Sequence, residues 1–236
     1  MKFAYLIEPP FNYCEADGTV TGCDVELARY VVAKMGFDGF EPVETEFADL
    51  LPGVAAGRWR MTTGLFGTEE RKIVASFSRP IWALPDGLLV TKRNPFGLVG
   101  YKSATEQAGC VLAVIRDQFQ HRSAVQFGIP DDRIRIFDTY KDAATALCEG
   151  HVGAYASVAR AHSGFIERNP DLDLELIVVP EAEKKSAFGS FAFAKADDDF
   201  RKDVDRVLRD YLGSSAHRTM MSRYGFSDEE IDLLIS

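Results

Sequence analysis

Strand-like and helix-like segments alternate along most of this chain. A short apolar run at Phe3–Ile7 predicts a strand, and two further strands are expected at Glu41–Phe47 and Arg60–Thr63. Asp24–Met35 carries apolar residues at the three- and four-residue spacing of a helix. A shorter helix is predicted over Asp49–Ala56. Strands that alternate with helices usually form a parallel sheet with the helices packed on its faces. The order of elements therefore predicts an α/β fold.

The same alternation returns in the second part of the chain. The further predicted strands and helices are Cys110–Ile115, Gln118–Phe127, Arg133–Phe137, Tyr140–Glu149, Val152–Ser157 and Leu174–Val179. The two series share no residue-level repeat, so the sequence predicts two α/β units. Two extended runs, Gly87–Lys92 and Ala187–Lys195, are the candidates for carrying the chain between them. Helices are then expected over Phe200–Leu212 and from Ser227, which opens a capping-box pattern.

A turn at Asp17-Gly18 predicts a hairpin over Tyr13–Gly22, and Asp24 can cap the helix that follows. Cys14 and Cys23 flank this turn and could face each other across the hairpin. We favour two buried free thiols over a disulfide for this pair. The sequence also leaves the state of Cys110 and Cys148 open.

Charge and hydropathy exclude several classes of protein. The formal net charge is -9 and Lys or Arg residues form no basic stripe, which argues against a nucleic-acid partner and against a polybasic membrane contact. No apolar run approaches the roughly 20 residues that span a bilayer. The run at Phe3–Ile7 is too short for the apolar core of a signal peptide. The protein is therefore expected to be either cytoplasmic or a mature form whose leader has been removed.

Signatures of catalysis are sparse. The sequence has neither of the common phosphate-binding glycine loops and no Gly-x-Ser-x-Gly motif. Cys148 and His151 have a metal-like spacing, but no second pair completes a four-ligand site. We therefore expect no cofactor, no metal and no enzymatic activity.

The segment Gly64–Lys72 has the features of a carboxylate site. It predicts the end of a strand, a glycine turn and a helix that begins after Thr68, with Arg71 in the first helical turn. A guanidinium in that position can bind a carboxylate through two parallel hydrogen bonds, and backbone N–H groups of the turn can add donors. Taken alone, the pattern favours an exposed arginine on a helix face, because that is the usual state of this residue.

Several motifs together resemble a known family. They are Glu8-Pro9-Pro10-Phe11, Gly22-Cys23-Asp24-Val25-Glu26-Leu27-Ala28, Phe47-x-x-Leu50-Leu51-Pro52, Gly64–Lys72, Phe77-Ser78-x-Pro80, Ala143–Leu147 with Gly150-His151-Val152, and Met220-x-x-x-Tyr224. In order and spacing they resemble the polar-amino-acid type of bacterial solute-binding protein, family 3, which serves ABC importers. The resemblance covers nearly the whole chain.

This resemblance implies a two-lobed periplasmic-binding-protein type II fold, the Venus flytrap, with two hinge strands and a ligand in the cleft. Lobe 1 would comprise residues 1–89 plus 190–236, and lobe 2 residues 90–189. The implied function is capture of a small carboxylate-bearing solute, an amino acid or a modified or betaine-like amino acid, by a monomeric periplasmic protein. Its partner would be an ABC transporter permease. Two rivals stay open: a cyclohexadienyl or prephenate dehydratase with Glu8 as general acid, and a ligand-sensing module.

The resemblance also assigns ligand contacts. Arg71 matches the arginine that binds the ligand carboxylate, and Thr63 and Gly64 match positions whose hydroxyl and carbonyl touch the ligand. The other matched positions are Phe11, Phe47, Trp82, Arg116 and Gln118.

Departures from the family pattern concern the ligand's ammonium group. The usual aspartate after the second-lobe strand corresponds to Val158, with Ser157 beside it, and the aspartate common at the strand start corresponds to Gly153. Phe66 replaces a family Ser or Thr, and Glu8 replaces a wall aromatic. Two explanations remain. Either Glu8 supplies the negative charge, or a delocalised or alkylated cation is held by Phe11, Phe47, Phe66 and Trp82 through cation–π contacts.

Overall fold

The computed structural model describes residues 1–235. The chain divides into two compact units: unit 1 is Met1–Ala83 with Ala187–Ser236, and unit 2 is Leu84–Ser186. The expected segments, 1–89 plus 190–236 and 90–189, place each boundary a few residues later in the chain. Within residues 1–235, no helix combines the length and the apolar character needed to cross a membrane.

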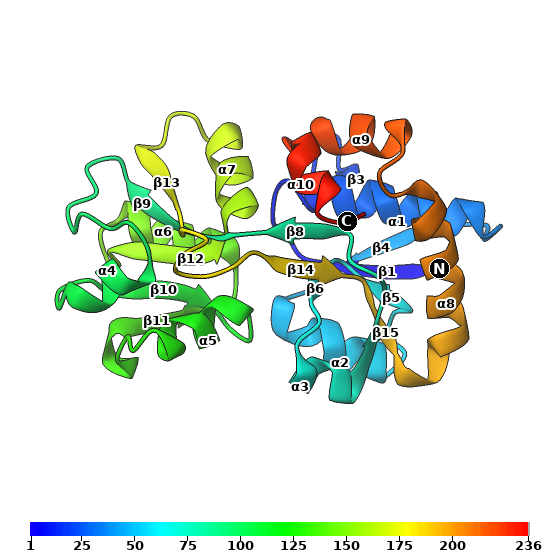
Figure 1. Cartoon of the computed structure of the whole chain (residues 1–236), viewed down its shortest axis with the longest axis horizontal. Helices are drawn as coiled ribbons and strands as arrows, with labels where there is room; N and C mark the ends of the chain where they lie inside the picture. Colours follow the sequence, from blue (N-terminus) through cyan, green and yellow to red (C-terminus); the bar gives the residue numbers. More distant parts are fainter. Residues whose placement is uncertain (236) are drawn as a thin grey trace. The chain divides into compact units, whose positions relative to one another are not determined.

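Unit 1 contains both chain ends (Figure 1). Its elements are β1 (Lys2–Tyr5), β2 (Tyr13–Cys14), β3 (Val20–Thr21), α1 (Cys23–Lys34), β4 (Glu41–Glu44), the 3-10 helix η1 (Phe47–Asp49), α2 (Leu50–Ala55), β5 (Met61–Thr62), β6 (Leu65–Phe66), α3 (Glu69–Val74), β7 (Ala75–Phe77), β8 (Trp82–Leu84), β14 (Ala187–Ser190), β15 (Ala192–Ala194), η3 (Lys195–Asp197), α8 (Asp198–Tyr211), α9 (Ser215–Ser222) and α10 (Asp228–Asp232).

The sheet β4-β1-β5 is parallel, as the alternation predicts, with Phe3 opposite Pro42 and Met61. Its core packs Ala4 against Leu50, Val54 and Trp59. Smaller sheets, β6-β14-β8 and β15-β7, join the N-terminal segment to the segment that begins at Ala187. The C-terminal helices therefore pack on the N-terminal half of unit 1, and Tyr30 of α1 stacks on Tyr211 of α8 with ring centroids 3.8 Å apart.

Helix α1 begins differently from the prediction. Its N-cap is Gly22, and the expected cap, Asp24, is the second residue of the first helical turn, with its side chain buried. Gly22 has φ 125, and an added Cβ would lie 2.1 Å from the Phe11 carbonyl oxygen. Only glycine fits this position, because it combines left-handed backbone with close backbone contact. The helix therefore begins without a side-chain cap, and the Asp24 carboxylate is available for other contacts.

Unit 2 is built around one sheet. Its elements are β9 (Asp86–Thr91), α4 (Tyr101–Glu106), β10 (Leu112–Ile115), α5 (Phe119–Gln126), η2 (Asp131–Arg133), β11 (Ile134–Phe137), α6 (Tyr140–Cys148), β12 (Ala154–Val158), α7 (Ala159–Arg168) and β13 (Leu174–Val178). The strand order is β11-β10-β12-β9-β13, and β9 runs antiparallel to both of its neighbours. The predicted parallel arrangement is thus correct for β11-β10-β12. The run Gly87–Lys92, which was expected to carry the chain between the units, instead lies mostly in β9, an interior strand of this sheet.

The cysteines do not form disulfides in the described part of the chain. Cys14, Cys23, Cys110 and Cys148 are all free thiols, and Cys23 and Cys110 are buried. The preference for free thiols at Cys14 and Cys23 is therefore confirmed. The expectation that both are buried is wrong for Cys14, because its hairpin strand lies at the surface.

Acid is expected to destabilise unit 2 through His162. This histidine is fully buried, its Nδ1 lies 2.7 Å from the Tyr140 hydroxyl, and burial lowers its pKa to about 3. The unfolded chain has a histidine pKa of about 6.5. Between these values the unfolded state binds a proton that the folded state does not, so stability falls as the pH drops below 6.5. At pH 5 the loss is about 2 kcal/mol relative to pH 7.

Urea unfolding followed by circular dichroism at pH 7 and pH 5 measures this loss. His162→Gln keeps an acceptor for Tyr140 and removes the titration, so its stability should vary less with pH. Equal pH dependence of the variant and the wild type would contradict the assignment to His162.

Candidate functional site

The loop before α3 places Arg71 as predicted. Thr68 caps the helix, and its hydroxyl accepts a hydrogen bond from the Arg71 backbone N–H at 3.3 Å. Glu69 and Glu70 fill the first turn, where negative charge is favourable to the helix dipole. The short helix thus begins at a defined residue, and the side chain of Arg71 leaves from its first turn.

The neighbours of the Arg71 guanidinium include Phe66 and Phe47. Arg71 Nη1 donates to the Phe66 carbonyl oxygen at 2.9 Å, and Arg71 Cζ lies 5.1 Å from the centroid of the Phe47 ring. Arg71 is half-buried, and so is Phe47, which also packs against the unit 1 core. A guanidinium carries five N–H donors in one plane, and the bond to the Phe66 carbonyl helps to orient that plane. This geometry suits a planar acceptor such as a carboxylate.

A second group of expected contacts gathers on one buried carboxylate, Asp24. Its side chain accepts four hydrogen bonds: Oδ2 from the Thr63 hydroxyl at 2.6 Å and the Gly64 N–H at 2.7 Å, and Oδ1 from the Trp82 indole N–H at 3.1 Å and the Cys23 thiol at 3.6 Å. Asp24 is 1% exposed. Burial raises the pKa of Asp24, and the hydrogen bonds from Thr63, Gly64, Trp82 and Cys23 act against that rise.

Asn12 extends this network. Its Nδ2 donates to the Thr63 hydroxyl at 2.7 Å, and that hydroxyl has already given its proton to Asp24. The Thr63 backbone is used as well: its N–H donates to the Ala4 carbonyl, and its carbonyl accepts from the Thr62 hydroxyl. Thr63 is 2% exposed and therefore serves mainly as a support for the half-buried Gly64.

Trp82 forms the centre of an aromatic cluster in unit 1. Its ring lies 5.3 Å from that of Phe11 and 5.6 Å, edge to face, from that of Phe66. Its indole N–H donates to Asp24, and the Trp82 side chain is buried, with 5% of the residue exposed. Trp82 therefore packs against Phe11 and Phe66, while its one polar group, the indole N–H, is used by Asp24.

Glycines make room for this indole. An added Cβ at Gly64 would lie 2.8 Å from Trp82 Nε1, and one at Gly189 would lie 2.1 Å from Trp82 Cη2. Gly189→Ala is therefore expected to displace the ring and to lower the stability of unit 1 by about 1–3 kcal/mol. Urea unfolding followed by far-UV circular dichroism, which reports on both units, measures the effect. Gly109→Ala is the control, since its Cβ would meet Phe96 at an ordinary 3.5 Å; equal effects of both changes would contradict the prediction.

Glu8 and Phe11 lie in the turn after β1. The Glu8 carbonyl accepts hydrogen bonds from the N–H groups of Phe11 and Asn12, at 3.0 and 3.2 Å. Glu8 is 8% exposed, so its carboxylate is not the solvated loop residue that its sequence position would suggest. The turn packs on the start of α1, because the Phe11 carbonyl accepts from the Asp24 N–H at 3.1 Å.

The expected contacts of unit 2 lie at the ends of its strands. Arg116 follows β10 and pairs with Asp138, Nε to Oδ1 at 2.6 Å, in an exposed position. Gln118 is the N-cap residue of α5 and is buried. Ser157 and Val158 end β12, opposite Gly87 and Asp86 of β9, and both are buried.

The structure explains one departure from the family pattern. An added Cβ at Gly153 would lie 2.7 Å from Phe96 Cε2 and 2.9 Å from Cys110 Sγ, so an aspartate has no room there.

Within unit 1, the structure brings Arg71 together with Phe47 and Phe66, and Thr63 and Gly64 together with Trp82. Sequence reasoning missed Asp24 and Asn12 as members of this region. Asp24 belongs to the Gly22–Ala28 motif, where it is the second residue of helix α1. An acidic residue at that place in the motif was the signal that could have identified it.

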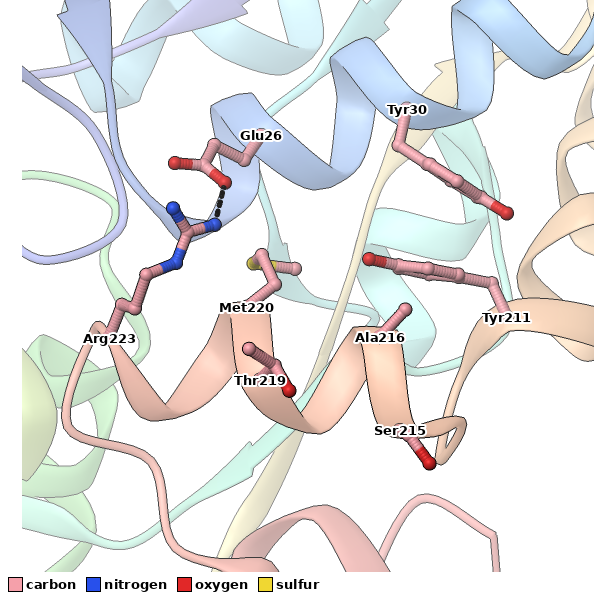
Figure 2. A pocket seen from close by; sticks show the side chains of 8 residues that line it. All are labelled: Glu26, Tyr30, Tyr211, Ser215, Ala216, Thr219, Met220 and Arg223. Carbon is pink, nitrogen blue, oxygen red and sulfur yellow. Dashed lines mark hydrogen bonds and ion pairs between the residues drawn. The ribbon is translucent and has the colours of Figure 1, made fainter.

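A surface pocket of about 470 Å³ in unit 1 is lined by Glu26, Tyr30, Tyr211, Ser215, Ala216, Thr219, Met220 and Arg223 (Figure 2). Its charged groups pair with each other, Arg223 Nη2 with Glu26 Oε2 at 2.6 Å, and its tyrosines stack together. None of these residues is an expected ligand contact. Across residues 1–235 no group of three or more His, Cys, Asp and Glu side chains is arranged to hold a metal ion.

Comparison with known proteins identifies the family. Residues 2–227 match the model of the bacterial extracellular solute-binding proteins, family 3. The match spans almost the whole sequence, and the chain belongs to this family.

Individual relatives agree with this assignment. The chain is 26% identical over 237 aligned positions, covering 98% of the chain and 78% of the relative, to a probable amino-acid ABC transporter periplasmic-binding protein, y4tE, of Sinorhizobium fredii. It is 25% identical to the arginine-binding protein ArgT of Corynebacterium glutamicum, covering 95% of the chain and 73% of the relative. The solved structure of EhuB in complex with hydroxyectoine aligns with a TM-score of 0.89 and 25% identity, covering 98% of the chain and 90% of EhuB.

The fold is the type II periplasmic-binding-protein fold, as the resemblance implied. The family and these relatives are solute-binding proteins and not enzymes, which argues against the dehydratase alternative.

Proposed function

We propose that this protein is the substrate-binding component of an ABC importer and that it binds a small carboxylate-bearing solute, an amino acid or a modified amino acid. The observation that carries the proposal is the oriented guanidinium of Arg71, held by the Phe66 carbonyl and stacked on Phe47. An oriented, planar guanidinium can form two parallel, charge-assisted hydrogen bonds with one carboxylate. The solutes named for the relatives, arginine and hydroxyectoine, both carry a carboxylate.

The apolar body of the solute would contact the rings near Arg71. Phe47 and Phe66 adjoin the guanidinium, and Phe11 and Trp82 continue the aromatic surface. In unit 2 we propose Arg116, Gln118 and Ser157 as further contacts. Because Val158 and Gly153 carry no charge, the positive group of the solute would be stabilised by Glu8 or by the aromatic rings.

The proposed partner and compartment are based on the family. We propose that the protein acts as a monomer outside the cytoplasm and delivers its solute to a membrane permease. The relatives support this, since y4tE is named as a periplasmic-binding protein of an amino-acid ABC transporter.

A thermal-shift screen tests the proposed class of solute. The panel should contain the amino acids, arginine included, together with hydroxyectoine, betaines and decarboxylated analogues of each. A solute present at 100 times its dissociation constant adds about 2.7 kcal/mol of stability and raises the melting temperature by several degrees. We expect carboxylates to raise it and their decarboxylated amines to leave it unchanged. Stabilisation by the amines to the same extent would contradict the proposal.

A further inference from the structure

A second cavity of unit 1 lies where the strands of the sheet β4-β1-β5 begin. Its volume is about 400 Å³, which is within the range of small-molecule sites. Its lining includes Lys2, the first residue of β1 at the chain end marked N in Figure 1, and Arg58 and Arg60, which come just before β5. The candidate contacts Glu8 and Thr63 follow the other ends of the same two strands. Because this sheet is parallel, the cavity and the candidate solute region lie at its opposite edges.

The lining of this cavity is positively charged, although the formal net charge of the whole chain is -9. The charged side chains that line it are three cations, Lys2, Arg58 and Arg60, and one carboxylate, Asp197. Arg60 binds that carboxylate through Nε at 2.6 Å and Nη2 at 3.0 Å. This pair uses two of the five N–H donors of a guanidinium. Asp197 therefore balances one of the three positive charges.

The acidic partners of the other two cations lie outside the lining. Lys2 Nζ lies 3.9 Å from Glu41 Oε1, and Arg58 Nη2 lies 3.0 Å from Asp49 Oδ1. About half or more of each of these four side chains is exposed. Exposed ion pairs contribute little to stability, because water screens them. An anion in the cavity can therefore share or replace these partners at little cost.

Aromatic rings restrain both guanidinium groups of the cavity. Arg58 Cζ lies 4.5 Å from the centroid of the Trp59 ring, and Arg60 Cζ lies 3.8 Å from that of Phe200 and 5.5 Å from that of Phe37. Donors that are already restrained lose less conformational freedom when they bind a ligand. Trp59 and Phe37 also line the cavity, and Phe37 remains 38% exposed, which leaves apolar surface for a ligand ring to cover.

We propose that this cavity is a second binding site of unit 1, which takes a small organic anion with a flat apolar body, such as an aromatic phosphate or carboxylate. Arg58 and Lys2 bind the anionic group, and Trp59 and Phe37 contact the ring. The site shares no residue with the candidate solute region around Arg71. Both sites can therefore be occupied at once, and this inference stands independently of the proposed function.

Titration of the isotope-labelled protein with phenyl phosphate, followed by heteronuclear NMR, tests the site. The chain has two tryptophans, so the indole N–H signal of Trp59 reports on this cavity and that of Trp82 on the candidate solute region. We expect saturable shifts of the Trp59 indole and of the Gly57 and Arg58 backbone amides, with a dissociation constant of about 1 mM or below. A Trp59 signal that does not move, or a shift of Trp82 alone, would overturn the proposal.

Two further probes separate the charge of the ligand from its ring. Phenethylamine carries a similar ring with a positive charge, and it should give no saturable shift at Trp59. Inorganic phosphate carries the charge without the ring, and it should bind at least about tenfold more weakly than phenyl phosphate, because it covers no apolar surface. Equal binding of phenethylamine and phenyl phosphate would show that the cavity does not select anions, and equal binding of the two phosphates would remove the role of the rings. Either result contradicts the proposed site.

Arg58→Gln tests the principal cation. We expect it to lower the affinity for phenyl phosphate by about tenfold or more, which corresponds to the loss of one hydrogen bond between charged groups. Arg206→Gln is the matched control, since Arg206 is an exposed residue of α8 that pairs with Asp203 at 2.9 Å, as Arg58 pairs with Asp49 at 3.0 Å. This control removes the same charge from the same unit outside the cavity, so its affinity should equal that of the wild type. Equal losses in both variants, or an Arg58→Gln affinity within about twofold of the wild type, would overturn the assignment.

Discussion

Arg71→Ala is expected to lower the affinity for a carboxylate-bearing solute by about 100-fold or more. Hydrogen bonds to charged groups contribute about 1.5–3 kcal/mol each, and the guanidinium can form two of them with one carboxylate. Each 1.4 kcal/mol corresponds to a factor of ten, so the loss of both bonds gives at least two orders of magnitude. The loss is expected to be independent of folding, because Arg71 is half-buried at the start of a short helix. Calorimetry with the solute found by the thermal-shift screen measures the effect.

Two further variants make this test specific. Arg71→Lys keeps the charge and loses the planar fork, so an intermediate loss of affinity is expected. Lys72→Ala removes the adjacent cation, which is exposed and pairs with Glu69 at 2.8 Å, and should leave the affinity unchanged. An Arg71→Ala protein that binds within about twofold of the wild type would exclude Arg71 as the carboxylate ligand.

Arg71 could be placed from sequence because its position depends on near neighbours. The cap at Thr68 and the first turn of α3 lie within three residues of it. The capping box of Ser227 and Glu230 in α10 was predicted for the same reason. Such local patterns are determined by steric and hydrogen-bonding rules that act within one turn. The same rules identified the alternation of strands and helices, and with it the α/β class.

The Asp24 network could not be predicted in this way. Its partners Thr63 and Trp82 stand 39 and 58 residues away in the chain, so a local reading assigned Asp24 the commoner role of a helix cap. For Thr63 and Trp82 the family resemblance indicated contacts with the ligand, while the structure shows that their donors bind Asp24. Thr63 and Trp82 have residue types that suit either a ligand contact or a structural bond to Asp24, and it is their burial that favours the structural bond.

Long-range pairing also explains the elements that were missed. Helix α4 begins at Tyr101, whose N–H donates to the carboxylate of Glu183, 82 residues later. Helix α7 follows β12 directly with Val158 as its N-cap residue and no side-chain cap, so the sequence carries no start signal there. The antiparallel direction of β9 likewise depends on partners, β12 and β13, that come much later in the chain.

Lys184→Met is expected to lower the stability of unit 2 by about 3–5 kcal/mol, since it leaves a buried carboxylate without its cation. Lys184 Nζ forms an ion pair with Asp86, whose side chain is 1% exposed, and Asp86 also accepts from the Tyr101 hydroxyl at 2.7 Å and from Gln120 Nε2 at 2.8 Å. Burial lowers the pKa of Lys184, and the attraction of Asp86 opposes that shift. Solvent therefore stabilises these two charges little, and each charge depends on the other for its stabilisation.

Hydrogen exchange on peptides from residues 84–186 measures this loss in the right part of the chain, because both tryptophans, Trp59 and Trp82, belong to unit 1. Lys185→Met is the matched control, since that neighbouring side chain is exposed and its loss should change protection little. In the double variant Lys184→Met with Asp86→Asn, the neutral amide can keep its bonds to Tyr101 and Gln120, so part of the stability should return. A double variant less stable than Lys184→Met alone would show that the carboxylate, and not the missing cation, dominates the energetics of this cluster.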